Sequence, residues 1–344
     1  MKNYQPLVVI LAVLVSVSSC KKIEQVLGIS GPEPQIKSKR YQNTSIATGW
    51  DIDDNSLNKR RIGEQIPSGM VFVEGGTFTK GRIQDDVMHD WNNMPTQQHV
   101  QSFYMDETEV TNAMYVEYLD YLKAVYPPSD SRYANIYKGA LPDTLVWRNR
   151  LGFNEAMIDN YLRHPAYALY PVVGVSWIQA TEYAQWRTDR VNEKRLEDQG
   201  FLEKEARLKV VSGEIEGTFN TQAYLNNPEE VYNGQMETLA PEQNNEKSRY
   251  AGRGSGILVP EFRLPTETEW EYSAQAQVSD THYYTGRKKY PWEGDRTRKT
   301  KGRDKGDQLA NFKQGKGDYG GIAGWSHDNA DITAEVGSYA PNDF

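Results

Sequence analysis

The chain has 344 residues, of which 38% are hydrophobic, and a formal net charge of −8. A single cysteine excludes a disulfide framework within the chain, so the fold has to rest on a hydrophobic core, in one large domain or two small ones. Nucleic acid is excluded as a partner, because the net charge is negative and no basic run is concentrated enough to offset it.

Residues 1–19 have the layout of an export signal. Lys2 supplies positive charge, an apolar run follows over 7–17, and small residues lead to Cys20. Because a membrane-spanning helix needs about 20 apolar residues, we interpret this run as a signal segment. The residues around Cys20 resemble a bacterial lipobox, so we predict that Cys20 is acylated and anchors the protein in a membrane. The alternative is an ordinary signal peptide with a chance cysteine.

Residues 20–67 are polar, with Gly-Pro-Glu-Pro at 31–34, and are typical of a tether that separates a folded part from a membrane. The folded domain is predicted from residue 68. Residues 70–73 and 77–79 are short β-type runs on either side of Gly75-Gly76, which predicts a hairpin. Residues 99–105 alternate in character and predict one further strand.

Three helices are predicted from their first residues. Thr111 caps the first helix, and Ser176 and Thr266 open the others, each with a capping-box partner three residues later, Gln179 and Glu269. The buried stripe of the first helix is predicted as Met114, Tyr115, Tyr118, Leu119 and Leu122. The inner faces of the others are predicted as Trp177, Ala180, Tyr183, Ala184 and Arg187, and as Trp270 and Ala274.

Two polar stretches separate these elements and are predicted to be insertions. Residues 125–165 are expected to hold one short helix. Residues 190–258 begin as a charged helical run to about Lys209 and then become rich in Asn, Glu, Gly and Gln. The tail from Tyr290 is expected to be mostly loop, so the pattern predicts an α+β domain with little regular structure.

Six segments occur in the order of a known family's signature blocks. They are MVFVEGGTFTKG (70–81), SFYMDETEVTNAMYVEYL (102–119), YPVVGVSWIQATEYAQW (170–186), FRLPTETEWEYSAQA (262–276), YPWEGD (290–295) and VGSYAPNDF (336–344). Together they resemble the formylglycine-generating-enzyme, or sulfatase-modifying-factor, domain. The resemblance implies a formylglycine-generating-enzyme-like (C-type-lectin-like) fold over 68–344. It also implies that this domain is incomplete, because the family continues past the block that ends at Phe344.

Enzymes of that family oxidise a substrate cysteine with copper held by paired cysteines, and thiolates suit Cu(I). Cys20 has no second cysteine to pair with, so we expect no catalytic residue and no redox cofactor in these residues. An oxidase whose cysteines lie beyond Phe344 is the alternative. In FRLPTETEWEY, Glu267, Glu269 and Glu271 are interpreted as helix-capping carboxylates rather than an acid–base site, with Arg263 pairing with one of them.

The family also holds structural calcium through an Asn in an Ala-Asn-aromatic stretch and a later Asp. Asn311 matches that Asn and Asp328 falls in the later region, although Asp318 or Asp331 serves equally well by position. Hard oxygen ligands of this kind suit calcium, so a structural calcium ion is a possible cofactor. Asp85, Asp86, His89 and Asp90 form the other cluster of potential ligands, which we interpret as a solvated acidic loop.

Within the family, DDVMHDWNN and QQHVQSFYMDETEVTN are most similar to gliding-motility lipoproteins. This resemblance implies a non-catalytic lipoprotein of the outer membrane, facing the periplasm, whose partners are other gliding-motility and type IX secretion components. A lipoprotein that binds glycan or peptidoglycan through exposed tryptophans at 147, 292 and 325 is the remaining alternative.

Overall fold

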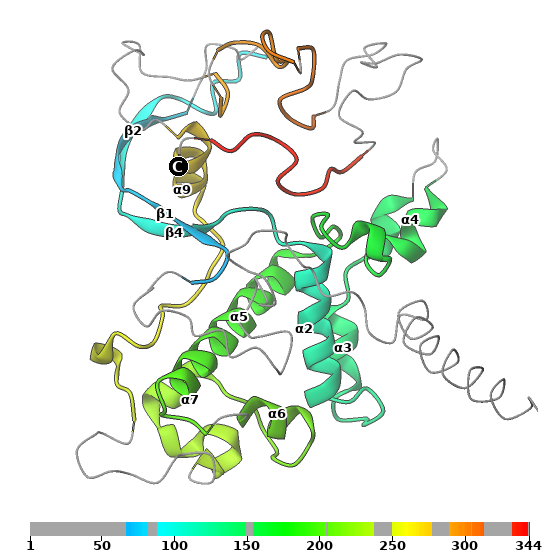
Figure 1. Ribbon diagram of the computed structural model, residues 1–344, viewed down its shortest axis with the longest axis vertical. Helices are drawn as coiled ribbons and strands as arrows, with labels where there is room; N and C mark the ends of the chain where they lie inside the picture. The colour runs from blue at the N-terminus through cyan, green and yellow to red at the C-terminus, as the bar shows by residue number, and fades with distance from the viewer. Residues whose placement is uncertain are drawn as a thin grey trace, which may run out of the picture.

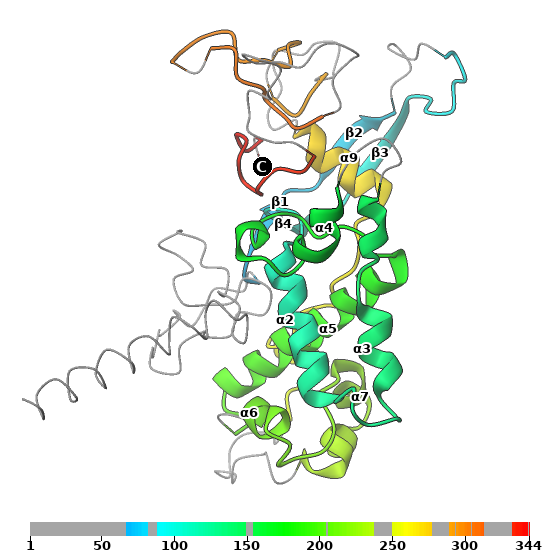
Figure 2. The same cartoon turned by 90° about the vertical axis from the view of Figure 1, so that its right-hand side faces the viewer.

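The computed structural model describes residues 67–81, 88–148, 154–203, 206–236, 250–276, 289–292, 294–303, 305–312, 332–342 and 344. The predicted signal peptide, Cys20 and the tether up to residue 66 lie outside these ranges. The described chain mixes helices with two small antiparallel sheets, as predicted for an α+β domain. In both views the strands and α9 lie at one end of helices α2 and α5, and α6 and α7 lie at the other (Figures 1 and 2).

The strands are β1 (Met70–Val73), β2 (Gly76–Lys80), β3 (Thr96–Val100) and β4 (Phe103–Asp106). The α-helices are α2 (Asn112–Val125), α3 (Ala134–Ala140), α4 (Glu155–Asn160), α5 (Trp177–Asp198), α6 (Ala206–Val211), α7 (Thr221–Asn226) and α9 (Glu267–Gln275). Short 3-10 turns are η1 (Thr144–Trp147), η2 (Pro165–Tyr167), η3 (Pro228–Gly234) and η4 (Arg253–Ser255).

The predicted hairpin of β1 and β2 is wrong. β1 pairs with β4 and β2 pairs with β3, in one continuous register, so the four strands form a long two-stranded ribbon. The strand pairing is interrupted at Gly75, whose backbone lies close to residues 100–102 of the opposite chain segment. The same interruption separates β3 from β4, which were predicted as one strand over 99–105. A Cβ on Gly75 would lie 2.5 Å from the backbone nitrogen of Ser102, which is why glycine is required there.

Helix α9 packs on β2 and β3, and its capping box is confirmed, with Thr266 Oγ1 accepting from the Glu269 nitrogen. The prediction that Trp270 faces inward is wrong, because Trp270 is 62% exposed and Tyr272 is buried instead. Tyr272 joins Val73, Phe78 and Val100 in the core of the ribbon. Its hydroxyl donates to the Glu74 carbonyl oxygen at 2.8 Å, so this one ring fixes the helix against the strands.

Helices α2 and α5 form the main core. The predicted α2 stripe is confirmed, since all five of its residues are buried, and Thr111 caps the helix as expected. The capping box of Ser176 and Gln179 is also present, and Tyr183 and Arg187 are buried as predicted. Trp177 is wrong as an inner residue, because it lies in the first turn with 72% of its surface exposed.

The described parts of the stretch 190–258 contain helices beyond the predicted charged run. Helix α5 ends at Asp198, and α6, α7 and η3 then enclose a second apolar cluster around Leu196, Phe219, Tyr224 and Met236. Residues 125–165 hold α3, η1 and α4 rather than one short helix. The described parts of the tail from residue 289 contain turns, bends and a single bridge between Arg298 and Gln308, as expected for loop.

Candidate functional site

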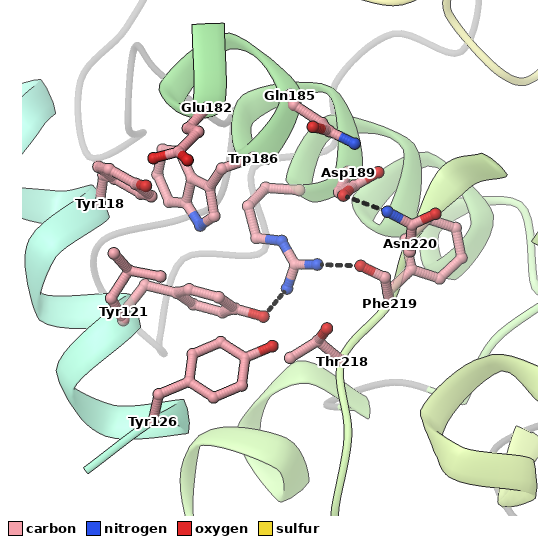
Figure 3. Close-up of a pocket in the computed structure, with 12 residues that line it drawn as sticks. Tyr118, Tyr121, Tyr126, Glu182, Gln185, Trp186, Asp189, Thr218, Phe219 and Asn220 are labelled. Carbon is pink, nitrogen blue, oxygen red and sulfur yellow. Dashed lines mark hydrogen bonds between the residues drawn. The ribbon is translucent and has the colours of Figure 1, made fainter. Parts of the chain in front are cut away.

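A pocket opens where α2, α5 and the segment 218–220 meet (Figure 3). Its volume is about 210 Å³, and we name it the α2–α5 pocket. Helix α2 and the residue that follows it supply tyrosines, α5 supplies charged and amide side chains, and the segment before α7 closes the far side. The lining residues include Tyr118, Tyr121, Tyr126, Glu182, Gln185 and Arg190.

Local sequence explains why these side chains converge. Tyr118 belongs to the apolar stripe that holds α2 against α5, and its ring lies 5.2 Å from Trp186 between centroids. Residues four apart share a helix face, so Glu182, Trp186 and Arg190 follow one another along α5 toward the second core. Asp189 accepts from the Thr221 nitrogen at 2.7 Å, which fixes the start of α7 beside the pocket.

The floor of the pocket is a fully buried ion pair. Arg190 Nη1 lies 2.9 Å from Glu193 Oε2, and both side chains are at most 2% exposed. Arg190 also donates to the Tyr121 hydroxyl and to the Phe219 carbonyl oxygen, the latter at 2.7 Å (Figure 3). The Tyr232 hydroxyl donates to Glu193 Oε1 at 2.6 Å. The guanidinium is therefore part of the structure and serves as the base of the pocket.

The wall of the pocket carries polar side chains that form no hydrogen bond or ion pair with other described residues. Within the described part of the chain, Tyr118, Tyr126, Glu182, Gln185 and Thr218 make no side-chain hydrogen bond or ion pair. Glu182 and Gln185 are exposed on α5, whereas Tyr118 is only 4% exposed. The pocket thus combines a fixed base with one carboxylate, one amide and three hydroxyls available to a ligand.

The electrostatics of the pocket follow from burial and from its acidic side chains. Burial and then the charge of Glu182 raise the pKa of Tyr118, so its hydroxyl stays protonated. Burial raises the pKa of Asp189, although the hydrogen bonds from Thr221 oppose that shift. Burial opposes the charge of Arg190, but Glu193 and the neighbouring tyrosines raise its pKa overall. Arg190 therefore stays charged and Glu193 compensates it.

The predicted helix cap is confirmed for Glu269 alone, and the other two carboxylates of FRLPTETEWEY, Glu267 and Glu271, bind groups outside the helix. Arg263 binds Glu269 with two nitrogens at 2.7 and 2.8 Å. Glu267 pairs with Lys80 at 2.9 Å, and Glu271 accepts from the Gly81 nitrogen at 2.8 Å. Both contacts hold α9 to the end of β2.

The predicted calcium site is only half described. Asn311 donates through Nδ2 to the Ile332 carbonyl oxygen at 3.1 Å, and Asp328, Asp318 and Asp331 lie outside the described residues. In the acidic loop, Asp85 and Asp86 are likewise outside, and Asp90 accepts from the Asn92 side chain. Among the side chains that the structure describes, no three of His, Cys, Asp and Glu gather to hold a metal ion.

The tryptophans named for glycan binding do not form one exposed set. Trp147 is buried, which contradicts its predicted exposure. Trp292 stacks on Tyr290 with centroids 4.9 Å apart and donates to the Arg296 carbonyl oxygen. Trp325 lies outside the described ranges. Over those ranges, no helix is both long enough and apolar enough to cross a bilayer.

The sequence interpretation missed the α2–α5 pocket and the Arg190–Glu193 pair beneath it. Arg190 and Glu193 are three residues apart on a helix, a spacing typical of a solvated surface pair. One signal for this burial was present in the sequence. Leu196 is an apolar residue two turns after Asp189 on the same side of α5, and it is fully buried. It indicated that the inner face continued into the charged run.

These features define an α+β domain with two helix cores, a capped helix held on a β-ribbon and a polar pocket between helices. Residues 57–344 match the sulfatase-modifying factor enzyme 1-like domain, and the chain belongs to that family.

The chain is also similar to a curated protein of Chlamydia trachomatis serovar L2 named serine/threonine-protein kinase Pkn1. The two are 32% identical over 176 residues, which is 51% of this chain and 25% of the relative. The Pkn1 protein of Chlamydia pneumoniae is 30% identical over 124 residues, which is 36% of this chain and 17% of that relative. The chain thus spans a quarter or less of the length of these two relatives.

Proposed function

We propose that the chain is a membrane-anchored binding protein that uses the sulfatase-modifying factor fold without oxidase chemistry. The observation that carries this proposal is that Cys20 is the single cysteine of the sequence. The family's oxidases hold copper with a pair of cysteines, and within residues 1–344 one sulfur cannot supply two thiolate ligands. An oxidase whose cysteines lie beyond Phe344 is the alternative. The setting of Cys20 favours its use as a lipid attachment point.

The finer proposal comes from resemblance to the gliding motility-associated lipoprotein GldJ, with its sister GldK as the nearest confusable relative. On that reading the protein sits in the outer membrane, faces the periplasm and binds other gliding-motility and type IX secretion components. We further propose the C-type-lectin-like fold for the domain.

Exposed aromatic residues support a binding role. Trp177, Trp270 and Trp91 are 72%, 62% and 55% exposed. Large exposed aromatic side chains are enriched where proteins bind one another, and they supply much of the binding energy there. Trp177 and Trp270 lie in the first turn of α5 and in α9, two helices that begin with a capping box.

Oxidase activity is tested directly on the purified full-length chain. The protein is loaded with copper and incubated in air with a cysteine-containing peptide, and formylglycine is sought by mass spectrometry. We expect no product. Formylglycine formed in proportion to bound copper would contradict the proposal.

Anchoring is tested by Cys20→Ala in the full-length chain, followed by fractionation of the cells. Without the thiol there is no site for acylation, so the variant is expected to leave the membrane fraction. Ser19→Ala keeps the thiol and another small residue before it, and serves as the matched control. Equal membrane retention of both variants would refute the anchor.

The partner class is tested by cross-linking the anchored protein in cells. Recovery of motility or secretion components supports the proposal. Retention of polysaccharide without any such protein would favour the glycan alternative, which rests less firmly now that Trp147 is known to be buried.

A further inference from the structure

We infer that the α2–α5 pocket binds one basic side chain, arginine or lysine, of a partner polypeptide. This inference rests on the proposed binding function and assigns a contact point to it. Glu182, Tyr118 and Gln185 are the groups of the pocket that receive the cation.

Charge is the first argument. Arg190 is neutralised by Glu193 at 2.9 Å, and the carboxylate of Asp189 accepts from the Thr221 nitrogen and from Asn220. The remaining carboxylate of the pocket is Glu182, which is exposed and has no partner within the described residues. A bound cation would form a charge-assisted hydrogen bond with it. The net charge of −8 also favours encounter with a basic partner.

The hydroxyl of Tyr118 is the second argument. Its residue is 4% exposed, yet the hydroxyl lines the pocket and makes no hydrogen bond to a described residue. The hydroxyl therefore has hydrogen-bonding capacity that a ligand in the pocket can use. The phenol oxygen accepts a hydrogen bond from an ammonium or guanidinium, and Figure 3 shows Tyr118 beside Glu182.

The arrangement of the rings argues for a side chain rather than a sugar. A sugar ring needs an open aromatic face on which to stack. The rings of Tyr118 and Tyr121 pack on Trp186, with centroids 5.2 and 5.9 Å apart, and Tyr126 packs on Tyr133 at 5.3 Å. These pairs are tilted, with interplanar angles of 51°, 57° and 60°, so each ring covers part of its neighbour's face and the polar edges reach the pocket. A pocket of about 210 Å³ is also smaller than the roughly 300–1,000 Å³ typical of small-molecule sites, which suits one long side chain.

The experiment titrates the full-length chain in detergent with blocked amino acids and follows heat by calorimetry. The probes are N-acetyl-arginine amide and N-acetyl-lysine amide, with N-acetyl-glutamine amide as the neutral control and an N-acetylglucosamine oligomer for the sugar alternative. The basic probes are expected to bind at millimolar strength, more weakly as salt rises, and the neutral probe not at all.

Three variants make the result specific. Glu182→Gln keeps the shape of the side chain and one acceptor oxygen but removes its charge, so the affinity for the basic probes is expected to fall about tenfold. Glu214→Gln changes the charge equally at an exposed position outside the pocket and should leave binding unchanged. Tyr118→Phe tests the hydroxyl, and its helical spectrum reports whether the fold is intact.

Three outcomes would overturn the inference: no binding of basic probes, equal binding by Glu182→Gln, or binding of the sugar oligomer that Glu182→Gln leaves intact. None of these outcomes affects the proposed function, because cross-linking in cells detects partners bound at any surface of the protein. Copper-dependent oxidation would instead defeat the proposed function without touching the measured affinity of the pocket.

Discussion

Two ion pairs on α5 show how burial changes what a residue contributes. Arg190 and Glu193 are almost fully buried, whereas Lys194 and Asp198 are 20% and 47% exposed. Exposed pairs contribute about 0–1 kcal/mol, because water already solvates both charges. A buried pair contributes little over an apolar replacement, but loss of one partner leaves a charge that water cannot reach.

Glu193→Gln is therefore expected to lower the free energy of unfolding by about 3 kcal/mol, because Arg190 stays charged and uncompensated. Asp198→Asn is the matched control, with an expected change below about 1 kcal/mol. Urea denaturation of the two variants measures both values. Equal losses would show that the pair at the base of the pocket is solvated.

At the scale of elements, the ribbon depends on a glycine for close approach. Gly75→Ala is expected to lower the free energy of unfolding by about 1–3 kcal/mol, because the new Cβ would overlap the backbone of the opposite strand. Gly139→Ala in α3 meets nothing within 4 Å and should raise stability by about 0.5–1 kcal/mol through helix propensity. Thermal denaturation distinguishes these opposite signs. An unchanged or raised stability for Gly75→Ala would contradict the close approach.

The cap of α9 predicts a pH dependence. The hydrogen bonds from Arg263, against the opposing effect of burial, lower the pKa of Glu269 from 4.5 to about 2. Between pH 2 and 4.5 the Glu269 carboxylate is therefore mostly ionised in the folded state, whereas the same carboxyl group is mostly protonated in the unfolded chain. The stability it contributes is complete above pH 4.5 and is lost as the pH falls toward 2.

Glu269→Gln should consequently be about 1–2 kcal/mol less stable than the wild type at neutral pH, with the difference shrinking as the pH falls from 4.5 toward 2. Urea denaturation across this range measures the difference, and Glu261→Gln, at an exposed position, is the control. A difference that stays constant with pH would assign the effect to packing.

The sequence predicted those elements whose determinants are local. Thr111, Ser176 and Thr266 each mark a helix start, because a cap needs only residues within one turn. Strand pairing depends on contacts between residues that are distant in sequence, so local sequence does not determine it. Gly75-Gly76 therefore led to a predicted turn, although the chain continues along the same ribbon. The site was missed for the same reason, since Arg190 becomes a buried residue only when 218–220 and η3 cover it.

At the scale of the whole molecule, α5 connects the ribbon to both helix cores. Its Arg187 donates to Asp106 at the end of β4 at 2.6 Å and to the Ser68 carbonyl oxygen at 3.1 Å, and lies over the Phe262 ring. Further along the helix, Asn192 donates to the Val259 carbonyl oxygen and accepts from its nitrogen. One helix thus fixes the ribbon, the approach to α9 and the second core.

This connection predicts that the ribbon opens separately when its link to α5 is weakened. Asp106→Asn removes the charge that compensates Arg187, and a hydrogen bond between charged groups contributes about 1.5–3 kcal/mol. The amides of 70–73 and 103–106 should then exchange with solvent at least about tenfold faster, while those of α2 and α5 keep their rates. Hydrogen exchange followed by mass spectrometry measures both regions in one sample. Asp130→Asn, which breaks an exposed local pair with Arg132, should change neither region. Faster exchange throughout the helices as well would show that the ribbon and the helix cores unfold as one unit.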